Sequence, residues 1–386
     1  MPKRNSNKKE ALDKHKKLGG KLSVEPKVRL RTRKDLSVYY TPGVGHVSLE
    51  IAKDKKKAKV LTIKKNTVLV VSDGSAVLGL GDIGPLGALP VMEGKAMILK
   101  EFAGVDAFPI VLDLPAPADT RERVIQAVET IKRIAPAFGG INLEDFSAPR
   151  CFEIEERLKK ELSIPVMHDD QHGTAIVVLA GLLNAARVIE KDIKKLRIVI
   201  QGAGAAGTAI AKLLHRYGVQ SITVLDSKGV IYTGRKGLNS YKKELALLTK
   251  TKYRTFEEAM DGADAVIGVS GPDSIKTRHV KSMAEKRIVF ALANPIPEID
   301  YVTAKEAGAY IIATGRSDFP NQINNALVFP GIFKGALMYN KRSVTEIMKI
   351  RAAEALARMV KRPARTRIIP GVFDIGAVMA IAQAMK

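Results

Sequence analysis

A glycine-rich turn constrains the fold of this chain more than any other sequence feature. The run Gly-Ala-Gly-Ala-Ala-Gly at 202–207 follows the apolar segment 197–200 and precedes a helical stretch over 208–217. In such a turn the first glycine permits a tight bend, the second lets the backbone approach a pyrophosphate, and the third allows the helix to pack closely on the strand. The chain is therefore expected to contain a βαβ unit that binds a dinucleotide.

An acidic residue in a suitable position strengthens this prediction. Asp226 follows the next apolar segment, 221–225, about 20 residues after the last glycine. A carboxylate at this position accepts hydrogen bonds from the adenosine ribose hydroxyls and favours NAD. Lys228, Arg235 and Lys236 follow closely and could hold the 2′-phosphate of NADP, so the sequence leaves NAD and NADP open. The predicted cofactor-binding residues are Gly202, Gly204, Ala205, Ala206, Gly207, Asp226 and Asn294.

Short apolar runs alternate with helical stretches in two regions of the chain, which is typical of parallel α/β sheets. At 386 residues and 46% hydrophobic, the chain is long enough to bury two cores. We predict an α/β fold with two domains, the second a doubly wound, Rossmann-type sheet, joined by a helix over 173–189. Helices are expected at 91–100, with Pro90 as first residue, and at 120–134. The predicted strands are 67–71, 108–112, 137–143, 164–167, 197–200, 221–225, 265–269, 287–293 and 309–313.

Two acidic pairs, Glu144-Asp145 and Asp169-Asp170, each follow a predicted strand of the first region. Adjacent side chains in a strand face opposite sides, so Glu144 and Asp145 can reach one ion only if their strand ends near Leu143. Hard oxygen donors without cysteine suit Mg²⁺ or Mn²⁺. The four carboxylates therefore predict a divalent metal site.

Two histidines lie close to these carboxylates. His168 and His172 have the spacing of a zinc helix, but the glutamate of the motif His-Glu-x-x-His is absent, and we expect them to support or pack against the site. Asn294, in Leu-Ala-Asn-Pro-Ile-Pro, ends a predicted strand at the edge where ligands bind. Its amide could bind a substrate carboxylate or the nicotinamide ribose, or it could simply form a turn.

Lys95 and Tyr40 have settings that suit proton transfer. Lys95 lies on a mostly apolar predicted helix, where partial burial would lower its pKa toward that of a usable base. Tyr40 precedes Thr-Pro-Gly-Val-Gly, a rigid turn that would hold the phenol in one orientation. Taken alone, each fits better as a structural residue: a lysine whose stem lies along apolar surface, and a packed tyrosine.

The net charge of +23 is concentrated partly in residues 1–34 and 53–65. These segments have few aromatic residues and no nucleic-acid-binding motif, so we expect a solvated basic surface that attracts anionic substrates, and no nucleic-acid partner. The longest apolar stretch, 175–183, is too short to span a membrane, and no secretory signal is visible. The lone Cys151 suits a reducing compartment, so a cytoplasmic location is expected.

Taken in order, these motifs resemble the malic enzymes of the small-subunit bacterial and archaeal kind, over about residues 35–385. The matching segments are Tyr-Tyr-Thr-Pro-Gly-Val at 39–44, Ser-Asp-Gly-Ser-Ala-Val-Leu-Gly-Leu-Gly-Asp-Ile-Gly at 72–84, Pro-Val-Met-Glu-Gly-Lys at 90–95, Ile-Asn-Leu-Glu-Asp at 141–145, His-Asp-Asp-Gln-His-Gly-Thr-Ala at 168–175, and Gly-Arg-Ser-Asp-Phe-Pro-Asn-Gln-Ile-Asn-Asn-Ala at 315–326.

The resemblance implies oxidative decarboxylation of L-malate to pyruvate and CO₂ with reduction of NAD⁺ or NADP⁺, dependent on Mg²⁺ or Mn²⁺. It also implies a homodimer, in which Tyr40 could serve the site of the partner. The residues implied are Glu144, Asp145 and Asp170 for the metal ion, Lys95 as general base with Asp169 beside it, Tyr40 as general acid, and Asn294, Asn324 and Asn325 for the substrate.

By the same resemblance, residues 1–165 would form the N-terminal catalytic domain and 166–325 the NAD(P)-binding domain, with 326–386 packing back on the first. Ala76 stands where larger, animal-type enzymes have an arginine that binds malate, so the substrate carboxylate must find another partner or rely on the metal ion and the asparagines. Alternatives are a malolactic enzyme, which would release lactate, and a simple malate dehydrogenase, which should need no divalent ion. A basic nucleic-acid-binding protein is the remote alternative.

Overall fold

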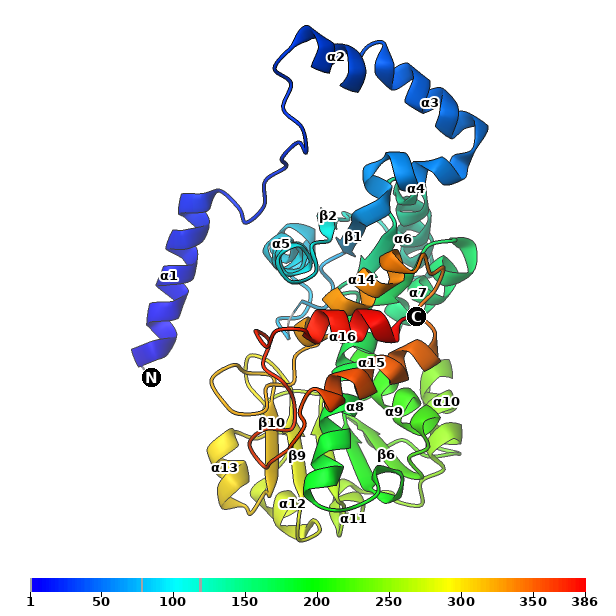
Figure 1. Ribbon diagram of the computed structural model, residues 1–386. Helices are drawn as coiled ribbons and strands as arrows, with labels where there is room; N and C mark the ends of the chain where they lie inside the picture. Colours follow the sequence, from blue (N-terminus) through cyan, green and yellow to red (C-terminus); the bar gives the residue numbers. More distant parts are fainter. Residues whose placement is uncertain (1, 78, 118–119) are drawn as a thin grey trace.

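The computed structural model describes residues 2–77, 79–117 and 120–386. Two predominantly parallel sheets, each covered by helices, form the upper and lower parts of the molecule in Figure 1, and helices of the C-terminal segment lie between them. The predicted α/β class with two sheets is confirmed. Among the described residues, no helix is both long enough and apolar enough to cross a membrane.

The first sheet has the strand order β2-β1-β3-β4, and all its strands are parallel. The two central strands, β1 and β3, are completely buried, which explains why both are rich in apolar residues. The strands are β1 (Thr67–Ser72), β2 (Asp106–Val111), β3 (Gly140–Leu143) and β4 (Val166–His168). The helices of this region are α4 (Ala58–Leu61), α5 (Gly84–Ala103), α6 (Arg121–Ile134) and α7 (Arg150–Glu161), with short 3₁₀ turns η1 (Lys55–Lys57), η2 (Ile63–Asn66) and η3 (Ala135–Ala137).

Two local predictions in this region are wrong. Pro90 lies inside α5 rather than at its first position, because the helix already begins at Gly84 with Pro85 in its first turn. The strand expected from residue 137 begins only at Gly140, because the preceding residues form the turn η3.

The second sheet has the order β10-β9-β8-β5-β6-β7, in which only β7 is antiparallel to its neighbour. The first strand of this sheet in the sequence is β5. The strands β6 and β7 lie on one side of it and β8, β9 and β10 on the other, so the strand order reverses between β5 and β8. Ligands bind at this reversal in such sheets. The strands are β5 (Arg197–Gln201), β6 (Ser221–Asp226), β7 (Gly229–Val230), β8 (Ala265–Gly268), β9 (Ile288–Ala291) and β10 (Ile311–Thr314). Its helices are α9 (Ala205–Tyr217), α10 (Ser240–Thr249), α11 (Phe256–Met260), α12 (Thr277–Ser282) and α13 (Tyr301–Glu306), with the turns η4 (Ile193–Lys195) and η5 (Asn325–Leu327).

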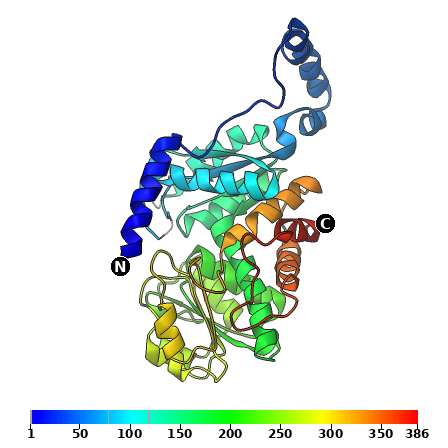
Figure 2. The same cartoon turned by 60° about the vertical axis from the view of Figure 1, so that its left-hand side comes forward.

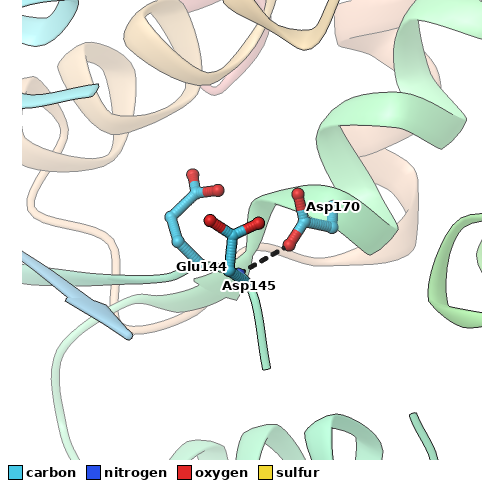
Figure 3. Close-up of side chains that lie close together, drawn as sticks. All are labelled: Glu144, Asp145 and Asp170. Atoms are coloured by element: carbon cyan, nitrogen blue, oxygen red, sulfur yellow. Dashed lines mark hydrogen bonds between the residues drawn. The ribbon is translucent and has the colours of Figure 1, made fainter. Parts of the chain in front are cut away.

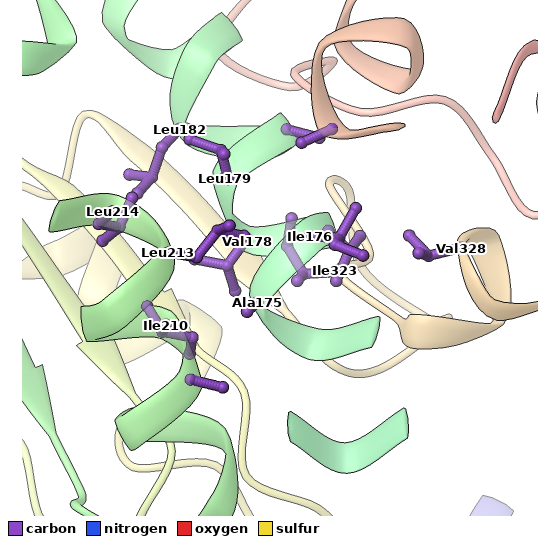
Figure 4. Close-up of a cluster of buried hydrophobic side chains, with 14 of the residues drawn as sticks. Ala175, Ile176, Val178, Leu179, Leu182, Ile210, Leu213, Leu214, Ile323 and Val328 are labelled. Atoms are coloured by element: carbon purple, nitrogen blue, oxygen red, sulfur yellow. The ribbon is translucent and has the colours of Figure 1, made fainter. Parts of the chain in front are cut away.

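Helix α8 (Asp169–Val188) joins the two sheets, since it begins directly after β4 and packs along α9. Figure 4 shows its apolar side chains between those of α9 and the segment that carries Ile323 and Val328. Each leucine that is fully buried here contributes about 2 kcal/mol to stability. The first turn of α8, which carries two of the predicted acidic residues, is therefore held in place by the core itself.

The C-terminal segment contributes α14 (Phe329–Met338), α15 (Glu346–Arg358) and α16 (Ala377–Ala384). Helix α14 contacts α5 and β3, α16 contacts α5, and α15 contacts α8 and α9. The buried side chain of Asn184 in α8 donates hydrogen bonds to the carbonyl oxygens of Ala357 and Ile368, both at 2.9 Å. This segment thus touches both sheet regions.

The N-terminal residues form an arm whose part over 33–53 extends away from the first sheet in both views (Figures 1 and 2). Nearer its start, Lys21 donates hydrogen bonds to Pro90 and Glu93 of α5. Its helices are α1 (Pro2–Leu18), α2 (Arg33–Tyr39) and α3 (Gly43–Lys53). Neither α2 nor α3, all of whose residues are described, buries a side chain in this chain. Apolar residues are nevertheless exposed along both: Leu36, Val38, Tyr39, Val44, Val47 and Leu49.

We expect Asn184→Ala to lower the free energy of unfolding by about 2 kcal/mol, because two buried carbonyl groups of the C-terminal segment lose their donor. Chemical denaturation gives the value. The exposed Gln220→Ala variant is the control and should unfold like the unaltered chain. Equal stability of all three proteins would contradict the idea that this side chain fixes the C-terminal segment.

Candidate functional site

The two acidic residues after β3 point to the same side because the backbone turns sharply between them. Asp145 has a φ of 55°, in the left-handed region, which aspartate adopts more readily than most residues. The turn ends the alternation of the strand, so the carboxylates of Glu144 and Asp145 lie side by side (Figure 3). The strand ends at Leu143, as the metal-site hypothesis required.

Asp170 completes a cluster of three carboxylates. It lies in the first turn of α8, where the helix dipole favours negative charge, and its Oδ2 accepts a hydrogen bond from the Asp145 backbone N–H at 2.8 Å (Figure 3). One carboxylate oxygen from each of Glu144, Asp145 and Asp170 lies within 4.8 Å of the others. The structure thus brings together the three residues expected to hold the metal ion.

Lys95 reaches the same cluster from α5. Its Nζ lies 2.5 Å from Asp169 Oδ2 and 3.0 Å from Glu144 Oε1, and 4.7 Å from the ring centre of Phe329 in α14. Only 11% of the lysine side chain is exposed. Lys95 and Asp169 are therefore neighbours, as expected.

The expectation of a lowered lysine pKa is wrong for this arrangement. Burial by itself would lower the pKa of Lys95, but the nearby charges of Asp169, Glu144 and Asp170 outweigh burial and raise the pKa above its ordinary value. The sequence could not show that several carboxylates surround one ammonium group. Lys95 is therefore protonated in the arrangement that the structure describes.

The cluster has the charge of a site for a divalent cation. Burial raises the pKa of Glu144 well above its ordinary value; Lys95 opposes this effect, and the neighbouring aspartates increase it. The carboxyl groups of Asp169, Glu144 and Asp170 lie around the ammonium group of Lys95, and buried negative charge in excess is unfavourable without a compensating cation. Oxygen donors of this kind fit Mg²⁺ or Mn²⁺.

The histidines lie behind the carboxylates, in the supporting positions expected for them. Burial lowers the pKa of His172 to about 4, so its ring is neutral near pH 7. The neutral ring can accept from Lys349 Nζ at 2.8 Å and donate to Glu155 Oε2 at 2.9 Å. Glu155 also accepts from the backbone N–H of His168 at 2.9 Å. This network connects α7, the start of α8 and α15.

A cavity of about 590 Å³ opens beside the carboxylate cluster. Asp145 and Asp170 line one part of it, and the predicted substrate residues line another: Asn294, Asn324 and Asn325. Ala76 also lines it, and its N–H donates to the carbonyl of Asp145 at 2.9 Å. Within the described ranges no lysine or arginine lines this cavity, so its side-chain donors for an anion are the asparagine amides and the hydroxyl groups of Thr174 and Ser270.

A second cavity, also of about 590 Å³, runs along the glycine-rich turn to Asp226. It shares four lining residues with the first: Val269, Ser270, Gly271 and Pro272. Gly207 cannot carry a side chain, because a Cβ there would lie 1.8 Å from the carbonyl oxygen of Gly202. Ala205 and Ala206 form the first turn of α9, whose free N–H groups favour a pyrophosphate.

Several residues that line the second cavity were not predicted from the sequence. Phe152 of α7 and Tyr241 of α10 lie with ring centres 4.6 Å apart and form one wall. Asn239 and Lys242 line the cavity near Asp226. No local pattern marks these residues, because only the packing of α7 and α10 brings them to the edge of the second sheet.

Tyr40 is not brought to this site within one chain. It lies at the end of α2 with 63% of its surface exposed. Helix α2 is in the arm, far from α8 in both views (Figures 1 and 2). The predicted acid is thus separated from the predicted base, Lys95.

Comparison with known proteins gives the same family for both parts of the chain. Residues 19–159 match the family model "Malic enzyme, N-terminal domain", and residues 171–385 match "Malic enzyme, NAD binding domain". The NAD-dependent malic enzyme of Geobacillus stearothermophilus is 54% identical over 95% of this chain and 76% of that protein. The bifunctional malic/malolactic enzyme of Bacillus subtilis is 51% identical over 97% and 91%. Relatives described as NADP-dependent also match most of the chain.

Solved structures agree with these matches. The crystal structure of the NAD-dependent malic enzyme from Thermotoga maritima superposes with a TM-score of 0.92 at 47% identity. The alignment covers 97% of this chain and 98% of that one, so both sheets and the helices between them are shared.

We expect Gly173→Ala to reduce malate-dependent reduction of the nicotinamide coenzyme by on the order of 10²-fold. A Cβ at Gly173 would lie 1.8 Å from Asp169 Oδ1, so the carboxylate that holds Lys95 must move. Gly94→Ala is the matched control, since a Cβ there meets nothing within 4 Å beside the same lysine. Similar rates for the two variants, with both folded by thermal unfolding, would show that the position of Asp169 is unimportant.

Proposed function

This chain belongs to the malic enzyme family, whose reaction is the oxidative decarboxylation of malate with NAD or NADP and a divalent metal ion, and we propose how its own residues divide that reaction. The observation that carries the proposal is the buried contact of Lys95 with Asp169 and Glu144, directly beside the cluster of three carboxylates. In this assignment L-malate occupies the cavity lined by Asp145, Asp170 and the asparagines.

Glu144, Asp145 and Asp170 would hold Mg²⁺ or Mn²⁺, which when bound supplies Lewis acidity at the C2 oxygen of the substrate. The glycine-rich turn and the first turn of α9 would hold the coenzyme pyrophosphate, and the coenzyme when bound would supply the hydride acceptor for C2. Asn294, Asn324 and Asn325 are assigned to the substrate, because their amides can donate to its carboxylates in a cavity without a lining cation among the described residues.

Lys95 is assigned as the general base that takes the proton of the C2 hydroxyl. The carboxylates raise its pKa, and neutralisation of their charge in the loaded site would weaken that effect and favour the free amine. Asp169 holds Nζ in position through the 2.5 Å contact. After CO₂ has left, C3 requires a proton, and Tyr40 is assigned as the acid that donates it.

We propose that Tyr40 acts in the site of a second copy of this chain, in a homodimer. The arm carries exposed apolar side chains on α2 and α3 and buries none of their residues, and such a surface favours association. An arm that reaches across to a partner would cover this surface and move the phenol away from its own chain. The second copy would thus supply Tyr40 as the acid, because a single chain does not place its own Tyr40 beside Lys95.

The chain is further proposed to divide into a catalytic domain (1–165) and a coenzyme domain (166–325), with 326–386 returning to the first. The contacts of α14 and α16 with α5 support the assignment of 326–386 to the first domain. A cytoplasmic location, with small molecules rather than nucleic acid as ligands, is proposed on the basis of the single buried Cys151 and the carboxylate-rich site.

The products test the function directly. With malate, Mn²⁺ and either NAD⁺ or NADP⁺, the chain is expected to form pyruvate, CO₂ and reduced coenzyme in equal amounts. Lactate without net reduced coenzyme would identify a malolactic enzyme. Oxaloacetate formed without a divalent ion would identify a simple malate dehydrogenase.

Asp145→Ala should lose most of its turnover and bind Mn²⁺ at least about tenfold more weakly, because it removes a proposed ligand. Electron paramagnetic resonance measures the free Mn²⁺, and a steady-state assay measures turnover. Glu285→Ala is the control: it removes one exposed carboxylate elsewhere and should change neither the affinity for Mn²⁺ nor the turnover. Normal activity of Asp145→Ala at limiting Mn²⁺ would exclude Asp145 as a ligand.

Lys95→Ala and Tyr40→Phe should affect different steps. Lys95→Ala is expected to slow hydride transfer from malate by about 10²-fold or more, the contribution of a positioned base. Tyr40→Phe should leave hydride transfer faster than pyruvate formation, so that reduced coenzyme appears before pyruvate in a single turnover. If Tyr40→Phe instead slows both equally, with no lag before pyruvate, the tyrosine is the better candidate for the base.

Mixed dimers of the same two variants test the exchange of arms. If Tyr40 acts across the interface, one of the two sites in a Lys95→Ala/Tyr40→Phe hybrid lacks both groups and the other is intact. The hybrid should then recover activity that neither parent dimer has. If Tyr40 acts within its own chain, each site lacks one group and no activity returns.

A further inference from the structure

Glu298 is a buried carboxyl group that the proposed reaction does not use. It is completely buried and directly follows the Asn-Pro-Ile-Pro turn after β9. Its Oε1 accepts a hydrogen bond from the backbone N–H of Ser270 at 2.7 Å, and its Oε2 accepts one from the backbone N–H of Ala293 at 3.1 Å. One side chain therefore joins the turn after β8 to the turn after β9.

Two backbone hydrogen bonds strengthen this connection. The N–H of Ile275 donates to the carbonyl oxygen of Glu298 at 3.0 Å, and the N–H of Asp273 donates to that of Pro297 at 3.3 Å. Gly268, the last residue of β8, leaves room for the carboxyl group, because a Cβ there would lie 2.5 Å from Glu298 Cδ. The carboxyl group thus occupies a position that only a glycine at 268 allows.

A carboxyl group in this position is costly to bury. Burial raises the pKa of Glu298 above its ordinary value, and backbone N–H groups oppose this effect, among them those of Ser270 and Ala293. An apolar side chain of similar size could fill the same space but could not accept hydrogen bonds from these two N–H groups. The carboxyl group therefore serves to fix the backbone of the two turns.

The backbone that Glu298 fixes belongs to the wall that the two cavities share. Ser270 is one of the four residues that line both cavities, and Ala293 lines the first. Asp226 lines only the second cavity, whereas the shared wall is the place where this cavity meets the first. In the proposed assignment the nicotinamide ring has to lie where the coenzyme cavity meets the substrate cavity, which is at this wall.

We propose that Glu298 is a positioning residue, which fixes the shared wall for the nicotinamide ring by holding the N–H groups of Ser270 and Ala293. Glu298 is absent from the described lining of both cavities, so it acts through the backbone of the two turns. Without it the ring would have to order the wall as it binds, and only a fraction of the chains would be ready to accept the ring. This role rests on the proposed function only in taking the second cavity as the coenzyme site and the first as the substrate site.

The test measures how much the nicotinamide ring adds to binding. Isothermal titration calorimetry on the full chain compares NADH with ADP-ribose and NADPH with 2′-phospho-ADP-ribose, two pairs that differ only in the ring. The reduced coenzymes are used because their ring is uncharged, so the charge of Glu298 does not bias the comparison. In at least one pair the unaltered chain should bind the whole coenzyme about tenfold more tightly than its fragment.

Glu298→Gln should remove most of this advantage and leave the affinity for the fragment similar, because a side-chain amide has one acceptor oxygen for two N–H groups. Gly268→Ala should have the same effect, since the added Cβ displaces the carboxyl group. Asp264→Asn is the matched control. Asp264 is also a buried carboxylate that accepts from a backbone N–H of this sheet, that of Arg197 at 2.9 Å, but it lies directly before β8, at the opposite end of that strand.

An unchanged advantage of the whole coenzyme in Glu298→Gln and Gly268→Ala, an equal loss in Asp264→Asn, or no such advantage in the unaltered chain would overturn the inference. Loss of the fragment together with the coenzyme would also overturn it, because Glu298 would then support the sheet as a whole.

Calorimetry needs no turnover, so the result is independent of the malate assay. A chain whose Glu298→Gln variant loses the advantage, but which does not oxidise malate, would contradict the proposed function and leave the role of Glu298 intact. A chain that oxidises malate and keeps the advantage in both variants would do the reverse.

Discussion

The contact of Lys95 with Asp169 and Glu144 is the interaction on which the rest of the site depends. It joins three elements that are separate in sequence, since the lysine comes from α5, the glutamate follows β3 and the aspartate begins α8. Three carboxyl groups, those of Asp169, Glu144 and Asp170, lie around this ammonium group, and such an excess of negative charge favours a bound cation. In the proposed assignment, the same ion pair would account for both the position of the base and the need for a metal ion.

Helix α8 couples this charge cluster to the coenzyme-binding sheet. Its first turn carries Asp169 and Asp170, and its apolar side packs on α9, the helix whose first turn faces the coenzyme cavity. Behind the carboxylates, the hydrogen bonds of His172 with Glu155 and Lys349 connect the same turn to α7 and α15. The carboxylate cluster and the second cavity are thus connected by one helix, which in the proposed assignment would favour a fixed distance between substrate and nicotinamide.

The sequence predicted those features that depend on local patterns. The buried strands, the glycine-rich turn and the carboxylates at the ends of β3 and β4 are all readable from neighbouring residues, and the left-handed turn at Asp145 explains why an adjacent acidic pair can serve one ion. It did not predict the raised pKa of Lys95, because that depends on carboxylates from other elements. Lys242 was missed for the same reason, since only the packing of α10 against β6 brings it to Asp226.

The most direct test of the account is a crystal structure with Mn²⁺ bound, measured at the manganese absorption edge. We predict an anomalous peak with oxygen ligands from Glu144, Asp145 and Asp170 of one chain, the ammonium group of Lys95 beside it, and Tyr40 of a second chain at the same cavity. An anomalous peak elsewhere in the chain, with these three carboxylates uncoordinated, would contradict the central claim.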